Sequence, residues 1–356
     1  MADMIIAAPM AGGPSTPALV RAIALEGAHK GCFGFLASGN ITAAQLACDI
    51  AEVGDVVFGI NFFMPQHFVP SAAQLAQAAE AVLPIVSQCA PAGQQVAVSS
   101  DFAFQPADLG NQFEEKFAVA VDSQATVLSA SFGCFDKEHL DRIHEHGKQA
   151  WVNVTCVSEA LAAMRHSEES IDALIVQGHE AGGHRLSWEV EQCPNNTPTA
   201  QLLVEVAEAL ADAGFAGTKL VAAGGVRNGR GIRALIDAGA SAVMCGSAFL
   251  LADEAGTNPA NRQLLREHRS AGLSSVSSRG FSGRVARGLA TPVTELANHG
   301  MDHVSKDEDD FAPVYPYLSQ LTKLIPGGYC LSGDPEGISA GPAGSIVASL
   351  IDESGI

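Results

Sequence analysis

Eight short apolar segments, each followed by a loop and most by a helix-like stretch, recur along the first two thirds of the chain. Apolar runs bounded by polar residues or glycine predict strands that are buried on both faces, as in parallel sheets covered by helices. The segments are Met4–Ala8, Cys32–Leu36, Val56–Asn61, Thr126–Ser131, Ala150–Thr155, Ala173–Gln177, Lys219–Ala223 and Ala242–Cys245.

Eight such repeats favour an α/β fold of the (β/α)₈ (TIM) barrel type, with the active site at the carboxyl ends of the strands. The alternative is an open doubly wound sheet. It is disfavoured because no G-x-G-x-x-G string follows the first strand.

The predicted barrel occupies residues 1–252, with an enlarged excursion over residues 66–124 between the third and fourth strands. An alanine-rich helix is predicted within the excursion, over Ser71–Gln88. Residues 253–326 are predicted to form a smaller, mainly helical lid domain that contributes to the substrate site. The glycine-rich tail, residues 327–356, is expected to pack back on the barrel.

Composition narrows the classes of partner. Asp and Glu number 39 against 20 Lys and Arg, so the formal charge is −19, which disfavours nucleic acid and anionic membranes. No apolar run reaches the roughly 18 residues of a membrane span, and the start lacks the basic region of a signal peptide. The eight cysteines are scattered without a C-x-x-C pair, so a reduced, cytoplasmic protein is expected. The oligomeric state stays open, a homodimer included.

The most informative string is Gln177-Gly178-His179-Glu180-Ala181-Gly182-Gly183-His184-Arg185, directly after the sixth strand. Paired glycines allow a ligand to approach the main chain closely, because no Cβ intervenes. Histidine changes its charge nearest to neutral pH. His184 is therefore the candidate catalytic residue, while Glu180 either orients His184 or caps a helix.

Two glycine-containing loops follow the seventh and eighth strands. Gly224-Gly225 comes after Lys219–Ala223, and Gly246-Ser247 comes after Ala242–Cys245. Main-chain N–H groups at such strand ends bind phosphate, and the loops after strands seven and eight of a barrel are a frequent phosphate site. Each glycine pair alone is more often a tight turn, but together they predict a phosphate cradle.

Six strings in this order resemble the nitronate monooxygenase family, long called 2-nitropropane dioxygenases, which are flavin enzymes on a (β/α)₈ barrel. The strings are A-P-M-A-G at residues 8–12, G-I-N-F-F at 59–63, Q-G-H-E-A-G-G-H-R at 177–185, A-G-G-V at 223–226, G-S at 246–247 and F-S-G-R-x-A-R at 281–287.

The resemblance implies FMN bound across the top of the barrel. In that arrangement Met10 and Ala11 contact the isoalloxazine, and Asn61 and Gln177 hydrogen-bond its polar edge or the ribityl chain. Gly182 and Gly183 permit close approach of the flavin, and His184 is catalytic. The phosphate is held by Gly224, Gly225, Gly246 and Ser247. Ser131, Glu180, Ser282 and Arg284 are the candidate lining of the substrate pocket.

The activity implied is oxidation of alkyl nitronates, and of nitroalkanes as a further substrate class, by O₂ to a carbonyl compound and nitrite. His184 would donate a hydrogen bond to the nitro oxygens or remove the α-proton. No metal is expected, because no set of His, Cys and carboxylate residues with ligand spacing is present.

Two departures from the family pattern concern the substrate. Leu186 stands where the family usually has glycine, and Ser131 stands where close relatives have a second histidine. Two alternatives remain open at this stage. One is a flavin-dependent enoyl-acyl carrier protein reductase or another NAD(P)H-dependent flavin reductase, and the other is a non-catalytic protein that binds flavin or phosphate.

Overall fold

Eight parallel strands close into a barrel in the computed structural model, which describes residues 4–66, 87–88, 111–166, 171–189, 195–278, 284–291, 294 and 328–356. The barrel strands, in spatial order, are β1 (Met4–Ala7), β2 (Phe33–Ala37), β3 (Phe58–Phe63), β4 (Val127–Ser131), β5 (Gln149–Val154), β6 (Ala173–Gln177), β8 (Lys219–Ala223) and β9 (Ala242–Cys245). Pairing of β1 with β9 closes the ring. The (β/α)₈ prediction is therefore confirmed.

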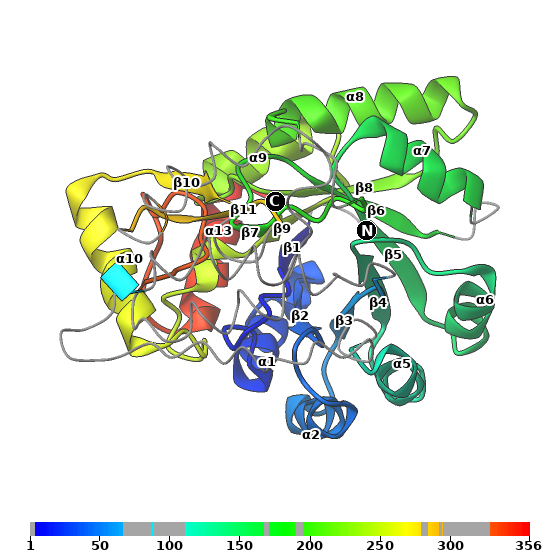
Figure 1. Cartoon of the computed structure of the whole chain (residues 1–356), viewed down its shortest axis with the longest axis horizontal. Coiled ribbons are helices and arrows are strands. Elements are labelled where there is room, and N and C mark those ends of the chain that lie inside the picture. Colours follow the sequence, from blue (N-terminus) through cyan, green and yellow to red (C-terminus); the bar gives the residue numbers. More distant parts are fainter. Residues whose placement is uncertain are drawn as a thin grey trace.

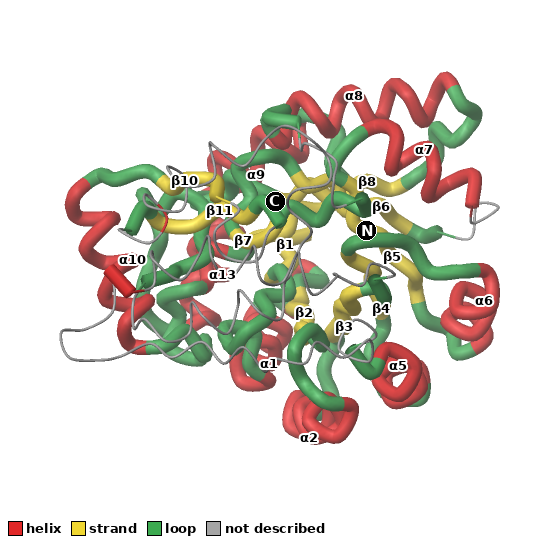
Figure 2. The backbone as a smooth tube through the Cα atoms, in the orientation of Figure 1, coloured by secondary structure: helices red, strands yellow, loops and turns green. Residues whose placement is uncertain are grey.

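Helices surround the barrel on its outside, as Figures 1 and 2 show. They are α1 (Pro17–Glu26), α2 (Ala43–Val53), α5 (Phe113–Val121), α6 (Lys137–Glu145), α7 (Val157–His166), α8 (Thr199–Asp212), α9 (Gly229–Asp237) and α13 (Ala343–Ser354), with short 3₁₀ turns η1 (Ala28–Lys30) and η2 (Ser247–Phe249). Polar side chains cap several of them. For example, Thr16 accepts from the amide of Leu19 at the start of α1.

Alternate strand residues divide between two apolar clusters. Ile6, Phe35 and Trp151 belong to a small cluster that fills the barrel interior, whereas Ile5 and Leu36 belong to the large cluster shared with the helices. Side chains that point inward and outward in turn explain why each strand reads as a continuous apolar run.

The last helix of the ring comes from the far end of the chain. After β9 the chain leaves the barrel, and α13 packs against α1 and α9 (Figure 1). Its buried face includes Ile346, Val347 and Leu350. The insertion between β9 and α13 contains helix α10 (Pro259–Ala271), which begins at the cap Asn258.

A small antiparallel sheet joins this insertion to the barrel mouth. Strand β11 (Ala286–Leu289) lies between β10 (Ser275–Ser278) and the two-residue strand β7 (Gly183–His184). The sequence did not predict this sheet, since the insertion reads as mainly helical. The helix predicted over Ser71–Gln88 lies outside the described residues except for residues 87–88, which are helical.

Candidate functional site

A cavity of about 350 Å³ opens at the carboxyl ends of the barrel strands. Every barrel strand contributes a residue near its carboxyl end: Ala8, Ala37, Asn61, Ser131, Asn153, Gln177, Ala223 and Met244. Among the residues selected from the sequence, the structure brings to this cavity Met10, Ala11, Asn61, Ser131, Gln177, Glu180, Gly182, Gly183, His184, Gly224, Gly225, Gly246 and Ser247. This is the position at which barrel enzymes carry their chemistry.

The paired glycines after β6 differ in what surrounds them. Gly183 has a φ of +86°, and a Cβ built on it would meet nothing within 4 Å. A Cβ on Gly182 would lie 2.2 Å from the amide nitrogen of Gly333. Gly183 therefore leaves main chain open beside the cavity, whereas Gly182 admits the C-terminal segment of the protein.

His184 follows Gly183 and lies in β7, where it pairs with Ala286 of β11. Its ring meets the ring of Phe132 edge to face, with centroids 6.4 Å apart. Burial, and secondarily the positive charge of Arg284, lowers the pKa of His184 to about 3. The imidazole is consequently neutral across the physiological range, with one N–H donor and one acceptor nitrogen.

Arg284 is not among the described residues that line the cavity, although its charge acts on His184. Its Nη1 donates to the carbonyl of Ser187 at 2.9 Å, and its Nη2 donates to Oε1 of Gln66. The guanidinium carbon lies 4.4 Å from the centre of the Phe132 ring. Arg284 therefore acts on the cavity through its charge. Ser282, the other residue selected from this stretch, lies outside the described residues.

The amide of Gln177 holds the loop that carries His184. Its Nε2 donates to the carbonyl of His184, and its Oε1 accepts from the amide of Leu186, both at 3.0 Å. Arg185 adds a second restraint, donating to the carbonyls of Gln177 and Thr155. Burial lowers the pKa of Arg185 to about 10, so its guanidinium stays charged at neutral pH.

Glu180 caps helix α8. Its Oε2 accepts from the amide of Thr199 at 2.9 Å and from the Thr199 hydroxyl at 3.0 Å. A carboxylate at a helix N-terminus satisfies a main-chain donor and interacts favourably with the helix dipole. Of the two roles considered for Glu180, the structure favours the cap.

The loops after β8 and β9 lie on one side of the cavity. Gly224 and Gly225 have φ values of +118° and +70°, a region that favours glycine. Ser247 begins η2, and its Oγ accepts from the amide of Gly333 at 2.8 Å. The amide of Gly229 at the start of α9 is already bound to Glu353, so main-chain donors on this side come from the loops.

Three buried polar side chains lie at the ends of β3, β4 and β5. The Nδ2 of Asn61 donates to the hydroxyls of Ser129 and Ser131, at 2.9 and 3.0 Å. The Nδ2 of Asn153 also donates to Ser131, at 3.0 Å. Asn153 was missed from the sequence, although a polar residue near the end of an apolar strand is the signal that selected Asn61.

The insertion between β9 and α13 also brings to the cavity residues that were not selected from the sequence: Ser275, Leu331, Gly333 and Asp334. Arg287, the last residue of the F-S-G-R-x-A-R string, and Arg227, from the loop after β8, line the cavity as well. Asp334 accepts from the amide and the hydroxyl of Ser275, both at 2.7 Å. No local pattern in residues 327–340 indicates that this segment crosses the barrel mouth.

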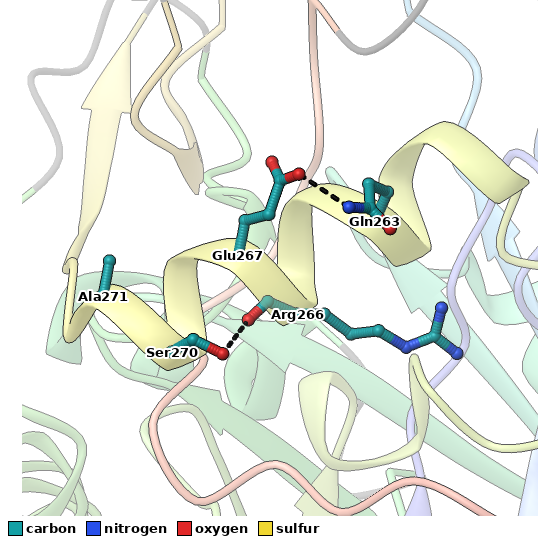
Figure 3. Close-up of a pocket in the computed structure, with 5 residues that line it drawn as sticks. All are labelled: Gln263, Arg266, Glu267, Ser270 and Ala271. Carbon is teal, nitrogen blue, oxygen red and sulfur yellow. Dashed lines mark hydrogen bonds between the residues drawn. The ribbon is translucent and has the colours of Figure 1, made fainter.

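A second, shallow hollow lies along helix α10 and is lined by Gln263, Arg266, Glu267, Ser270 and Ala271 (Figure 3). All five residues come from one helix, and Gln263 and Ser270 bond within it, to Glu267 and Arg266. Without convergent groups from other elements, this hollow is a poor candidate for a site.

Three further findings concern metal binding, the cysteines and membrane insertion. Among the described residues, no three His, Cys, Asp or Glu side chains gather in a way that could hold a metal ion. The cysteines described are free thiols: Cys32, Cys48, Cys134, Cys156, Cys245 and Cys330. Within the described part of the chain, no helix is long and apolar enough to cross a lipid bilayer.

Known proteins resemble this chain over nearly its whole length. A probable nitronate monooxygenase of Bacillus subtilis (strain 168) is 28% identical over 353 residues, which cover 98% of this chain and 91% of that protein. A probable nitronate monooxygenase of Staphylococcus aureus (strain MSSA476) is 27% identical, with coverage of 98% and 93%.

Solved structures agree with these relatives. Nitroalkane oxidase from Streptomyces ansochromogenes superimposes with a TM-score of 0.78 at 28% identity, covering 99% of this chain and 95% of that one. FabK from Thermotoga maritima has a TM-score of 0.67 at 19% identity, covering 99% and 92%, and it shows the shared fold alone.

The family model described as nitronate monooxygenase matches residues 1–352. The cavity at the barrel mouth, with the glycine pair and histidine of the loop after β6, lies within that match. The chain therefore belongs to the nitronate monooxygenase family of flavin oxidoreductases.

Proposed function

We propose that this protein binds FMN across the carboxyl ends of its barrel strands and oxidises alkyl nitronates with O₂ to a carbonyl compound and nitrite. One observation carries the proposal. The open main chain at Gly183 and the neutral imidazole of His184 face the same cavity as two glycine loops suited to a phosphate. The solved nitroalkane oxidase supports a nitro compound as substrate.

The donor groups present fit FMN. The loops at Gly224, Gly225 and Ser247 offer main-chain N–H groups to a phosphate without a lysine. Met10, Ala11 and Ala37 offer apolar surface at the ends of β1 and β2, as a flat ring system requires. A flavin held there would supply the redox chemistry, the transfer of electrons from the nitronate to O₂.

His184 acts as a hydrogen-bond donor rather than as a strong base. With its pKa lowered to about 3, the imidazole removes a carbon-bound proton poorly, but its N–H donates to a nitronate oxygen at neutral pH. This favours nitronates, which have already lost the α-proton, over neutral nitroalkanes. The positive charge of Arg284 close to His184 attracts an anion into a protein of net charge −19.

Spectroscopy and substrate oxidation test the proposal together. The purified protein is expected to show a flavin spectrum that propionate 3-nitronate bleaches anaerobically, with O₂ uptake and nitrite release in air. Rapid bleaching by NADH or NADPH with turnover of an enoyl thioester, and no reaction with the nitronate, would instead indicate a reductase.

Replacement of His184 tests its role. His184→Ala is expected to keep the flavin spectrum but to lose nitronate turnover roughly 10²-fold or more, the usual range for a positioned proton donor or acceptor. The matched control is His146→Ala, at the C-terminal cap of α6. The His146 ring makes its contacts at the surface, so its loss should leave turnover unchanged. Unchanged turnover in His184→Ala would remove His184 from the reaction.

A further inference from the structure

Three polar side chains of the cavity, Asn61, Ser131 and Asn153, lie opposite the glycine loops. In the closed order β1-β2-β3-β4-β5-β6-β8-β9, β3 lies across the barrel from β8, and β4 lies across from β9. A ligand whose phosphate rests on the loops after β8 and β9 and whose other end crosses the mouth reaches Asn61, Ser131 and Asn153. These residues therefore meet the ring end of such a ligand.

Hydrogen bonds leave one acceptor open in this group. The Nδ2 of Asn153 donates to the carbonyl of Ala130 at 2.8 Å and to the hydroxyl of Ser131 at 3.0 Å. Because the Ala130 carbonyl can only accept, Nδ2 must face it, and Oδ1 must point to the other side. In the part of the chain that the structure describes, no donor reaches Asn153 Oδ1, although the residue is only 4% exposed and lines the cavity.

The neighbouring amides are committed within the protein. Asn61 donates to Ser129 and Ser131, and its Oδ1 accepts from the Ser131 hydroxyl at 3.3 Å. Gln177 donates to the carbonyl of His184 and accepts from the amide of Leu186. Asn153 lines the cavity, and an acceptor that a ligand covers without supplying a donor is costly, so the side-chain carbonyl of Asn153 favours a ligand with an N–H group at this position.

We propose that Asn153 is a specificity residue of the cofactor site, whose Oδ1 accepts a hydrogen bond from the imide N–H of the flavin. This inference rests on the proposed function. The imide nitrogen, N3, carries the ring N–H of oxidised flavin and lies between two carbonyl acceptors. A single acceptor with a locked amide orientation therefore selects that edge and fixes which way round the ring system enters.

The test compares FMN with FMN methylated at N3, which keeps the phosphate and loses the donor. Dissociation constants are measured on apoprotein through quenching of flavin fluorescence. Wild type is expected to bind FMN about tenfold or more tighter than the methylated flavin, the scale of one buried hydrogen bond. In Asn153→Ala this preference should fall to near one.

The matched control is Asn258→Ala, because the Asn258 side chain caps α10 and does not line the cavity. Its two affinities should change together and keep the wild-type ratio. Should Asn153→Ala fail to fold, Asn153→Ser takes its place in the comparison.

Equal binding of both flavins by wild type, or a ratio that survives loss of Asn153, would overturn the inference and leave FMN binding intact. Failure of wild type to bind either flavin would overturn the proposed function and this inference with it.

Discussion

At the scale of single residues, residues of the same type play different structural roles in the cavity. Gly182 and Gly183 look equivalent in the sequence, yet the first makes room for the amide of Gly333 and the second leaves main chain open at the cavity. Asn61 and Asn153 are both amides near strand ends, but only Asn153 keeps an acceptor without a donor among the described residues. These differences depend on which distant segment lies beside each residue.

The depressed pKa of His184 has a consequence for acid stability. The pKa is about 3 in the folded protein against 6.5 for an ordinary histidine, so the unfolded chain binds the proton more readily between these values. Folding stability is therefore lost as the pH falls from 6.5 towards 3, by at most roughly 1.4 kcal/mol per pH unit.

His184→Gln, which lacks the titration, is expected to lose less stability than wild type between pH 7 and pH 4. The measurement is urea unfolding of both apoproteins at several pH values, since every other titrating group is the same in the two chains. Parallel curves for the two proteins would contradict the assignment of a buried neutral imidazole.

At the scale of elements, the eight barrel strands were predicted with ends within a residue or two of those observed. Because each strand is buried on both faces, its sequence is a continuous apolar run, and such a run can be recognised without knowledge of the tertiary structure. The sheet β10-β11-β7 has no such signal. Strand β10 is Ser-Val-Ser-Ser and β7 has two residues, so pairing across the mouth, and not composition, makes them strands.

The C-terminal segment that crosses the mouth depends on a missing side chain. Gly182→Ala would place a Cβ 2.2 Å from the nitrogen of Gly333 and is expected to displace the segment from Ser247. Flavin affinity should fall about tenfold or more, and protease cleavage near Gly333 should accelerate. Titration of apoprotein with FMN and limited proteolysis measure both effects.

Gly217→Ala is the control for this substitution, because a Cβ there meets nothing within 4 Å. Wild-type affinity and cleavage in Gly182→Ala would mean that the segment is held in some other way.

At the scale of the whole molecule, residues near the C-terminus complete the barrel. Helix α13 packs between α1 and α9 and buries Ile346, Val347, Leu350 and Ile351. The insertion that follows β9 therefore lies, in the sequence, between the last strand of the barrel and its last helix. This topology brings β11 and the segment around Gly333 to the mouth, where they contact the loop after β6.

Truncation of a buried side chain in α13 measures this contribution. Leu350→Ala is expected to lower the free energy of unfolding by roughly 2–5 kcal/mol, as for other buried leucines. Ser349→Ala, on the exposed side of the same helix, should change it by less than about 0.5 kcal/mol. Urea unfolding followed by circular dichroism compares the two, and equal small effects would show that α13 is dispensable to the barrel.

The sequence by itself determined the barrel, the loop that carries His184 and the two glycine loops, because apolar periodicity and glycine positions are local properties of the chain. Only the tertiary structure decided that Glu180 caps α8, that Gln177 holds the His184 loop, and that Asn153 presents an acceptor to the cavity. Each of these roles depends on a hydrogen-bond partner on another strand or loop, 7 to 23 residues away, and the local sequence pattern does not show which partners meet when the chain folds.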